Sequence, residues 1–179
     1  MTVINPCDFN QTKAATIAIA EHEGPVYLRF GRPKVANFTT DELAFKIGKG
    51  IVLNPGEDVT IAATGHLVWE ALLAAEELES EGITAEVINI HTIKPLDEAL
   101  ILESVLKTGA IVTAEEHNYI GGLGESISGA LSKNHPTPQE YIATQDTFGE
   151  SGTPIQLMEK YGLNKNAIIS ASKRVLARK

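Results

Sequence analysis

Apolar and polar positions alternate regularly along the middle of the chain. Three short, almost fully apolar runs are typical of strands that are buried on both faces: residues 59–63, 85–90 and 111–114. Each run is followed by a longer stretch with helical spacing: residues 67–78, 97–106 and 123–131. This order of elements predicts parallel strands that are joined by right-handed crossovers.

Further elements are predicted towards both ends of the chain. Short apolar runs predict three more strands: residues 3–4, 26–30 and 141–143. Residues with capping chemistry precede three more helical patterns: Asp8, Thr153 and Asn164. In the helix over residues 67–78, the large apolar side chains are the expected core anchors: Trp69, Leu72, Leu73 and Leu78.

Two units of unequal size follow from this pattern. Residues 1–38 contain one helix and two strands, too little to bury their own faces, and we interpret them as the tail of a domain whose beginning is missing. A linker without apolar periodicity runs to about Asp41, and a weak strand or hairpin is expected over residues 44–53. Residues 42–179 are predicted to form a three-layer α/β/α domain with a mostly parallel sheet of about five strands.

Charge and cysteine content narrow the function classes. The net charge is −8, with 15 basic and 23 acidic residues, and the basic residues cluster only in the tail around Lys173 and Lys179. This balance argues against a nucleic-acid or anionic membrane partner. A single cysteine, Cys7, and the lack of a long apolar run or leader pattern favour a soluble protein of a reducing cytoplasm.

Three histidines, His66, His91 and His117, each follow the end of a predicted parallel strand. If the strands share one sheet, all three side chains lie along the same edge, where a metal or phosphate could bind. Loops also supply polar residues without any site, and no pair of histidines shows metal-ligand spacing on a helix. We therefore assign no metal ligand and leave open whether these histidines bind anything.

Glycines follow the strand at residues 111–114. Gly121, Gly122 and Gly124 could hold a phosphate at a helix N-terminus, but they match neither the dinucleotide fingerprint nor the P-loop. We favour close packing of the helix on the sheet. The Phe-Gly-Glu-Ser-Gly turn at 148–152 is interpreted as a structural lead into the next helix.

Two residues are candidates for substrate binding. Arg32 lies at the end of a strand with Pro33 after it, where a guanidinium could donate two parallel hydrogen bonds to a phosphate. Asp8 could accept a hydrogen bond from a sugar hydroxyl, although helix capping already explains its position.

Several segments together resemble the C-terminal part of transketolase. They are TIAATG at 60–65, VINIHTIKPLD at 87–97, EEH at 115–117, GGLG at 121–124 and FGESG at 148–152. Their order is similar to the C-terminal domain shared by transketolase, deoxyxylulose-phosphate synthase and the β subunits of 2-oxoacid dehydrogenases. Residues 1–38 resemble the last helix and strand of the preceding pyrimidine-binding domain.

The resemblance implies transfer of a two-carbon ketol unit between sugar phosphates in the pentose phosphate pathway, with thiamine diphosphate and Mg²⁺ as cofactors. The chain contains no Gly-Asp-Gly motif, and the activating glutamate would precede residue 1. We therefore expect no cofactor on this chain alone and no turnover by it, and we expect the missing N-terminal domains or subunit to complete a homodimeric enzyme. The resemblance also implies that Arg32 holds the sugar phosphate and that Asp8 contacts a sugar hydroxyl.

Two alternatives remain open at this point. One is a deoxyxylulose-phosphate synthase or 2-oxoacid dehydrogenase β subunit, which would act on pyruvate or another 2-oxo acid. The other is a non-catalytic regulatory or assembly module that uses the edge bearing the histidines. Arg32 followed by Pro33 favours a phosphosugar.

Overall fold

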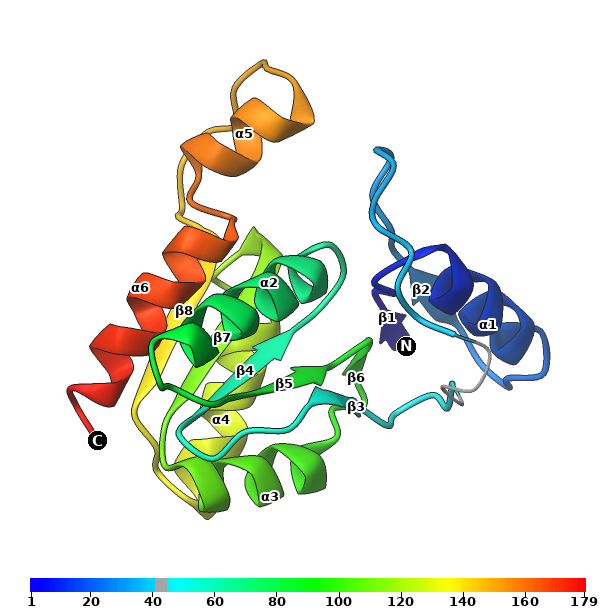
Figure 1. The fold of residues 1–179 in the computed structure, drawn as a ribbon. Coiled ribbons are helices and arrows are strands. Elements are labelled where there is room, and N and C mark those ends of the chain that lie inside the picture. Colours follow the sequence, from blue (N-terminus) through cyan, green and yellow to red (C-terminus); the bar gives the residue numbers. More distant parts are fainter. Residues whose placement is uncertain (41–44) are drawn as a thin grey trace.

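The structure is a computed structural model that describes residues 1–40 and 45–179 (Figure 1). The predicted start of the larger domain at residue 42, the end of the predicted linker at Asp41 and the expected start of a strand at Ala44 lie outside the described residues. Within the described ranges, none of the helices combines the length and the apolar content that crossing a bilayer requires.

The main sheet has five strands in the order β3-β5-β4-β7-β8. Their bounds are β3 Ile51–Asn54, β4 Val59–Ala63, β5 Ala85–Asn89, β7 Ile111–Asn118 and β8 Gln139–Thr144. All neighbours are parallel except β3, which pairs antiparallel with β5 at one edge. The predicted fold class, a mostly parallel sheet of about five strands, is confirmed.

Two helices cover each face of this sheet (Figure 1). On one face lie α2 (Leu67–Ser80) and α6 (Lys165–Leu176), and on the other lie α3 (Glu98–Thr108) and α4 (Leu123–Asn134). Successive residues of β4 enter the two cores, since Ile61 packs with α2 and α6 while Ala62 packs with α3 and α4. Burial on both faces explains why the strands are continuous apolar runs.

The core face of α2 differs from the prediction. Of the four expected anchors only Leu78 is fully buried, whereas Trp69, Leu72 and Leu73 are half-buried. The buried positions are occupied mainly by smaller residues: Leu67, Val68, Ala71, Ala74, Ala75 and Leu78. Alanines allow the helix to approach the sheet closely, so the larger side chains lie at the edge of the contact, where Trp69 stacks on Phe38 with ring centroids 5.4 Å apart.

A second, three-stranded sheet of order β2-β1-β6 contains strands from both predicted units. Its strands are β1 Thr2–Ile4, β2 Val26–Leu28 and β6 Thr92–Lys94, and α1 (Phe9–Ala20) lies beside it (Figure 1). β1 is parallel to β2 and antiparallel to β6, a short strand that the sequence pattern did not predict. The first forty residues therefore contribute no strand to the main sheet.

Candidate functional site

A large cleft lies beyond the carboxyl ends of β4, β7 and β8. Its volume is about 630 Å³, and its walls come from the loop at residues 32–36, the start of α2 and α5 (Pro154–Lys160). Parallel α/β sheets usually bind ligands at this edge. The charged side chains of the cleft are Arg32, Lys34, Glu70, Glu116 and Glu159.

Arg32, the first of the two predicted binding residues, lies in the loop after β2 and lines this cleft. The residue is exposed. Among the described residues, no carboxylate forms an ion pair with it. Its guanidinium is therefore available for an anionic ligand.

Three contacts fix the loop that carries Arg32. Gly31 packs so closely on the imidazole of His66 that any Cβ at position 31 would collide with the ring. The same imidazole pairs through Nδ1 with Oε2 of Glu116 at 3.2 Å. The guanidinium of Arg29 donates a hydrogen bond to the backbone oxygen of Glu116. The end of β7 thus positions the loop through His66 and Arg29.

The pairing of His66 with Glu116 also sets the electrostatics of the cleft. The hydrogen bond from His66 lowers the pKa of Glu116, and the charges of His66 and Arg29 act in the same direction. Glu116 is therefore ionised at neutral pH, and its carboxylate pairs with the imidazole of His66.

Asp8, the second predicted binding residue, occupies a different place. It is only 3% exposed and lines neither the larger cleft nor a smaller one beside the three-stranded sheet. Its carboxylate caps α1 by accepting from the backbone N–H of Gln11 at 2.9 Å. It also accepts from the backbone N–H groups of Phe38 and Thr39, at 2.9 and 2.6 Å, and from the hydroxyl of Thr39 at 2.7 Å. The structure does not bring Asp8 and Arg32 into one site.

The three histidines have three separate environments. His66 supports the loop of Arg32, whereas His91 is fully buried under Phe45, with ring centroids 4.3 Å apart. His117 is exposed, and its Nδ1 lies 2.7 Å from the backbone oxygen of Asn118. In the parts of the chain that the structure describes, no three His, Cys, Asp or Glu side chains are grouped to hold a metal ion.

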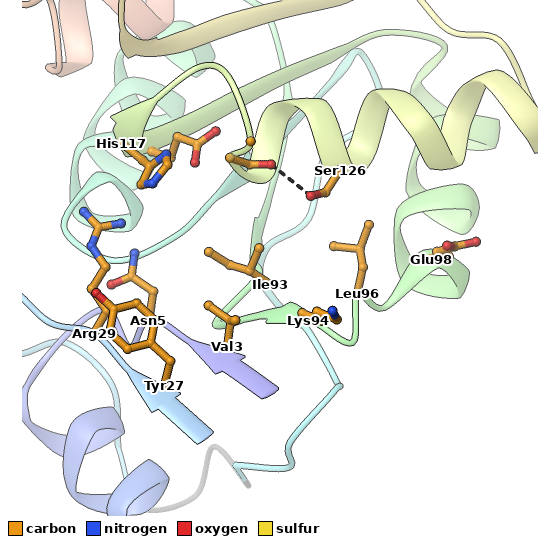
Figure 2. Close-up of a pocket in the computed structure, with 13 residues that line it drawn as sticks. Val3, Asn5, Tyr27, Arg29, Ile93, Lys94, Leu96, Glu98, His117 and Ser126 are labelled. Atoms are coloured by element: carbon orange, nitrogen blue, oxygen red, sulfur yellow. Dashed lines mark hydrogen bonds between the residues drawn. The ribbon is translucent and has the colours of Figure 1, made fainter. Parts of the chain in front are cut away.

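The smaller cleft, of about 430 Å³, lies between the three-stranded sheet and the start of α4 (Figure 2). Arg29, Asn5 and Tyr27 gather at one end below His117, Val3 and Ile93 form an apolar middle, and Lys94 and Glu98 lie at the other end. The basic and acidic side chains at this cleft balance each other. No net charge therefore favours an anionic ligand there.

Two of the three glycines near the start of α4, Gly122 and Gly124, pack closely, as the sequence analysis favoured, whereas a Cβ on Gly121 would meet nothing within 4 Å. A Cβ on Gly124 would collide with the ring of Tyr141 on β8, and one on Gly122 would collide with the carboxylate of Glu115. That carboxylate accepts from the backbone N–H groups of Leu123 and Gly124, at 2.7 and 2.8 Å. A side chain of the protein itself thus occupies the place where a phosphate could have bound. Burial raises the pKa of Glu115, while the two N–H groups oppose the shift.

Sequence reasoning missed Gly31, Glu116 and Arg29 as parts of the site. Glu116 follows an apolar run and lies at the carboxyl end of a predicted strand. This position indicated a polar residue near the edge of the sheet, but it did not indicate the contact with His66. The contact of Gly31 with His66 joins segments 35 residues apart and has no local signal.

Comparison with known proteins gives consistent matches over the chain. The family model for the transketolase C-terminal domain matches residues 48–168. The 6-deoxy-6-sulfo-D-fructose transketolase subunit of Clostridium sp. (strain MSTE9) is 47% identical over 100% of this chain and 56% of its own length. An apulose-4-phosphate transketolase subunit of Phocaeicola vulgatus is 36% identical over 94% of this chain and 54% of its own length.

One solved structure is similar over almost the whole chain. It is a split gene transketolase, an inactive beta4 tetramer, and has a TM-score of 0.96 and 45% sequence identity. The similarity covers 99% of this chain and 58% of that one. The chain therefore spans about half the length of these three relatives.

Proposed function

Because the chain belongs to the transketolase C-terminal domain family, we propose that it is part of a transferase that moves a two-carbon ketol unit between sugars with a terminal anionic group. The observation that carries this proposal is the exposed guanidinium of Arg32 in the cleft at the carboxyl edge of the main sheet. The names of two relatives add support, because one refers to a sulfonated sugar and the other to a sugar phosphate.

In this proposal Arg32 holds the terminal phosphate or sulfonate of the sugar. A guanidinium can donate two parallel hydrogen bonds to either group, and such charge-assisted bonds are stronger than neutral ones. His66 and Glu116 act as positioning residues, because they fix the loop through Gly31 without needing to touch the sugar.

The contact of Asp8 with a sugar hydroxyl stays a prediction. All four of its present donors come from the protein, so a sugar could be bound only if one of them moved away. Without such a change, Asp8 contributes by anchoring residues 38 and 39, at the far end of the loop that carries Arg32.

Thiamine diphosphate would supply the carbanion that accepts the ketol unit. The residues that the structure describes do not fit the metal part of that cofactor, because they include no cluster of three or more carboxylate, imidazole or thiolate groups. We propose instead that polypeptide outside the 179 residues binds thiamine diphosphate and Mg²⁺, and that this chain alone is inactive.

We further propose that the chain contributes to the dimer interface of the complete enzyme. The N-terminal half of that enzyme is either a separate subunit or part of a longer polypeptide. We also propose that the chain self-associates when the other half is absent. The support is the solved relative, which is a tetramer of β subunits.

Reconstitution with the complementary polypeptide, thiamine diphosphate and Mg²⁺ tests the activity. We expect ketol transfer from xylulose phosphate to ribose phosphate, and a parallel assay with a sulfonated ketose separates the two anionic groups. Condensation of pyruvate with glyceraldehyde phosphate instead would assign the chain to the deoxyxylulose-phosphate synthase branch. No turnover with any of these substrates, together with a melting temperature raised by metals or phosphorylated metabolites, would favour the non-catalytic module.

A further inference from the structure

The segment from Gln145 to Lys160 projects from the rest of the molecule (Figure 1). Phe148 is 98% exposed and Ile155, on α5, is 83% exposed. No residue of α5 is buried. We call this segment the α5 arm.

Several local interactions hold the α5 arm together. Thr153 and Gln156 form a reciprocal capping box, and Pro154 occupies the first turn of the helix. Lys160 pairs with Glu150 across the arm at 2.5 Å. These local interactions support a helix of only seven residues, which gains little stability from its own hydrogen bonds. Phe148 and Ile155 form an apolar surface that the described residues leave exposed.

The cleft beside the arm has the composition of a protein interface. Its apolar walls include Trp69, Met158 and Tyr161, and Arg32 lies in the opposite wall. Aromatic residues, methionine and arginine are the types enriched in the cores of protein interfaces, and tryptophan, tyrosine and arginine dominate binding energy there.

Opposite charges lie across the cleft. In the loop at residues 32–36, which lines it, the charged residues are both basic: Arg32 and Lys34. The α5 arm contains three acidic residues and one basic residue: Asp146, Glu150, Glu159 and Lys160. An acidic arm from another molecule would be attracted to Arg32 and Lys34, and it would be repelled by Glu70, which also lines the cleft.

We propose that a second copy of this chain docks here by mutual exchange, each copy placing Phe148 and Ile155 of its α5 arm in the cleft of the other. A two-fold axis makes such a contact self-complementary, because α5 of the arm forms one wall of the cleft in each copy. This inference rests on the self-association proposed above and names its surface. Arg32 is enclosed in the contact, so the self-associated form is closed to an anionic sugar.

Two arm variants and one matched control test the surface. Phe148→Glu and Ile155→Glu each place a charge in the contact, whereas Leu106→Glu changes a residue that is 65% exposed on α3, outside the cleft. By sedimentation equilibrium of the full chain, we expect both arm variants to weaken self-association at least tenfold and the control to match the wild type. Circular dichroism and the melting temperature verify that each variant is folded.

Other outcomes overturn the proposal in distinguishable ways. Self-association of a folded Phe148→Glu variant with wild-type affinity would remove the arm from the interface. If the arm variants lose affinity only for the complementary polypeptide, the arm docks that polypeptide instead. A wild-type chain that stays monomeric would refute the self-association as well as this surface, while the ketol-transfer assay would still decide the proposed activity independently.

Discussion

At the scale of single residues, the position of Arg32 depends on the absence of a side chain at Gly31. Replacing Gly31 with alanine would force the new Cβ against His66, so either the loop or the ring must move. We expect Gly31→Ala to destabilise the chain by about 1–3 kcal/mol, as other overpacked positions do, and to raise KM for the anionic sugar. Urea unfolding and steady-state kinetics measure the two effects.

Gly129 is the matched control, because a Cβ there meets nothing within 4 Å and the residue lies inside α4. Gly129→Ala should stabilise the chain by about 0.5–1 kcal/mol, because alanine has the better helix propensity. Equal destabilisation by both substitutions would show that the contact with His66 has no special role.

Arg32 itself is tested by Arg32→Gln in the reconstituted enzyme. Hydrogen bonds to a charged group contribute about 1.5–3 kcal/mol, which corresponds to a rise in KM of roughly 10- to 100-fold for phosphorylated or sulfonated sugars. A sugar without the anionic group should show no comparable change. Lys133→Gln, on α4 and outside both clefts, removes the same charge as a control. A loss of kcat with unchanged KM for the anionic sugar would contradict the assigned role.

The buried His91 makes the stability of the folded chain depend on pH. Burial lowers the pKa of His91 from 6.5 to about 4, although the backbone of Lys49 and the carboxylate of Asp97 act in the opposite direction. Between these values the unfolded chain binds a proton that the folded chain does not, so stability falls as pH falls. From about pH 7 to pH 5 we expect His91 to lower the free energy of unfolding by about 2 kcal/mol.

The variant His91→Leu removes this group from the titration. Between pH 7 and pH 5, its free energy of unfolding, measured in urea, should fall by about 2 kcal/mol less than that of the wild type. Parallel pH dependence of the two proteins would mean that His91 is not the group responsible.

At the scale of elements, the start of α4 depends on a buried carboxylate. Glu115→Ala leaves two backbone N–H groups without their partner, and we expect a cost of about 3 kcal/mol. Glu125→Ala removes a similar bond, from the N–H of Gly121 at 2.7 Å, but this one is exposed and should cost less than about 1 kcal/mol. Urea unfolding of both variants tests the difference, and equal costs would show that burial of Glu115 is unimportant.

Elements that form through interactions between residues close in sequence can be predicted from the sequence pattern, whereas elements that depend on distant residues cannot. The strands of the main sheet and the caps at Asp8, Thr153 and Asn164 depend on local patterns, and these predictions are confirmed. β6 is different, because its pairing with β1 links residues about ninety positions apart and covers only three residues.

β7 shows the limit of the apolar pattern. It continues through polar residues to Asn118, because pairing with Thr144 on β8 extends the ladder and α4 satisfies the carboxylate of Glu115. For the site, the sequence and its family resemblance pointed to Arg32, but the support from Gly31, His66 and Glu116 is a product of tertiary packing.

At the scale of the whole molecule, one cleft is proposed to serve both an anionic sugar and a second copy of the chain. Ligands that compete for the same surface must each weaken the binding of the other. Xylulose phosphate at about 100 times its dissociation constant should therefore reduce the affinity between copies by roughly 100-fold for each cleft. Sedimentation equilibrium over a series of sugar phosphate concentrations measures this shift.

Screening of charge could produce a similar dissociation, since the basic loop faces an acidic arm. Sodium chloride at matched ionic strength separates the two effects, because screening acts on all exposed charges without requiring Arg32. We expect the sugar phosphate to dissociate the wild type far more than chloride does, and this excess to disappear in Arg32→Gln. If chloride dissociates the copies equally well, the sugar phosphate does not compete at the cleft and the two proposed uses of Arg32 are independent.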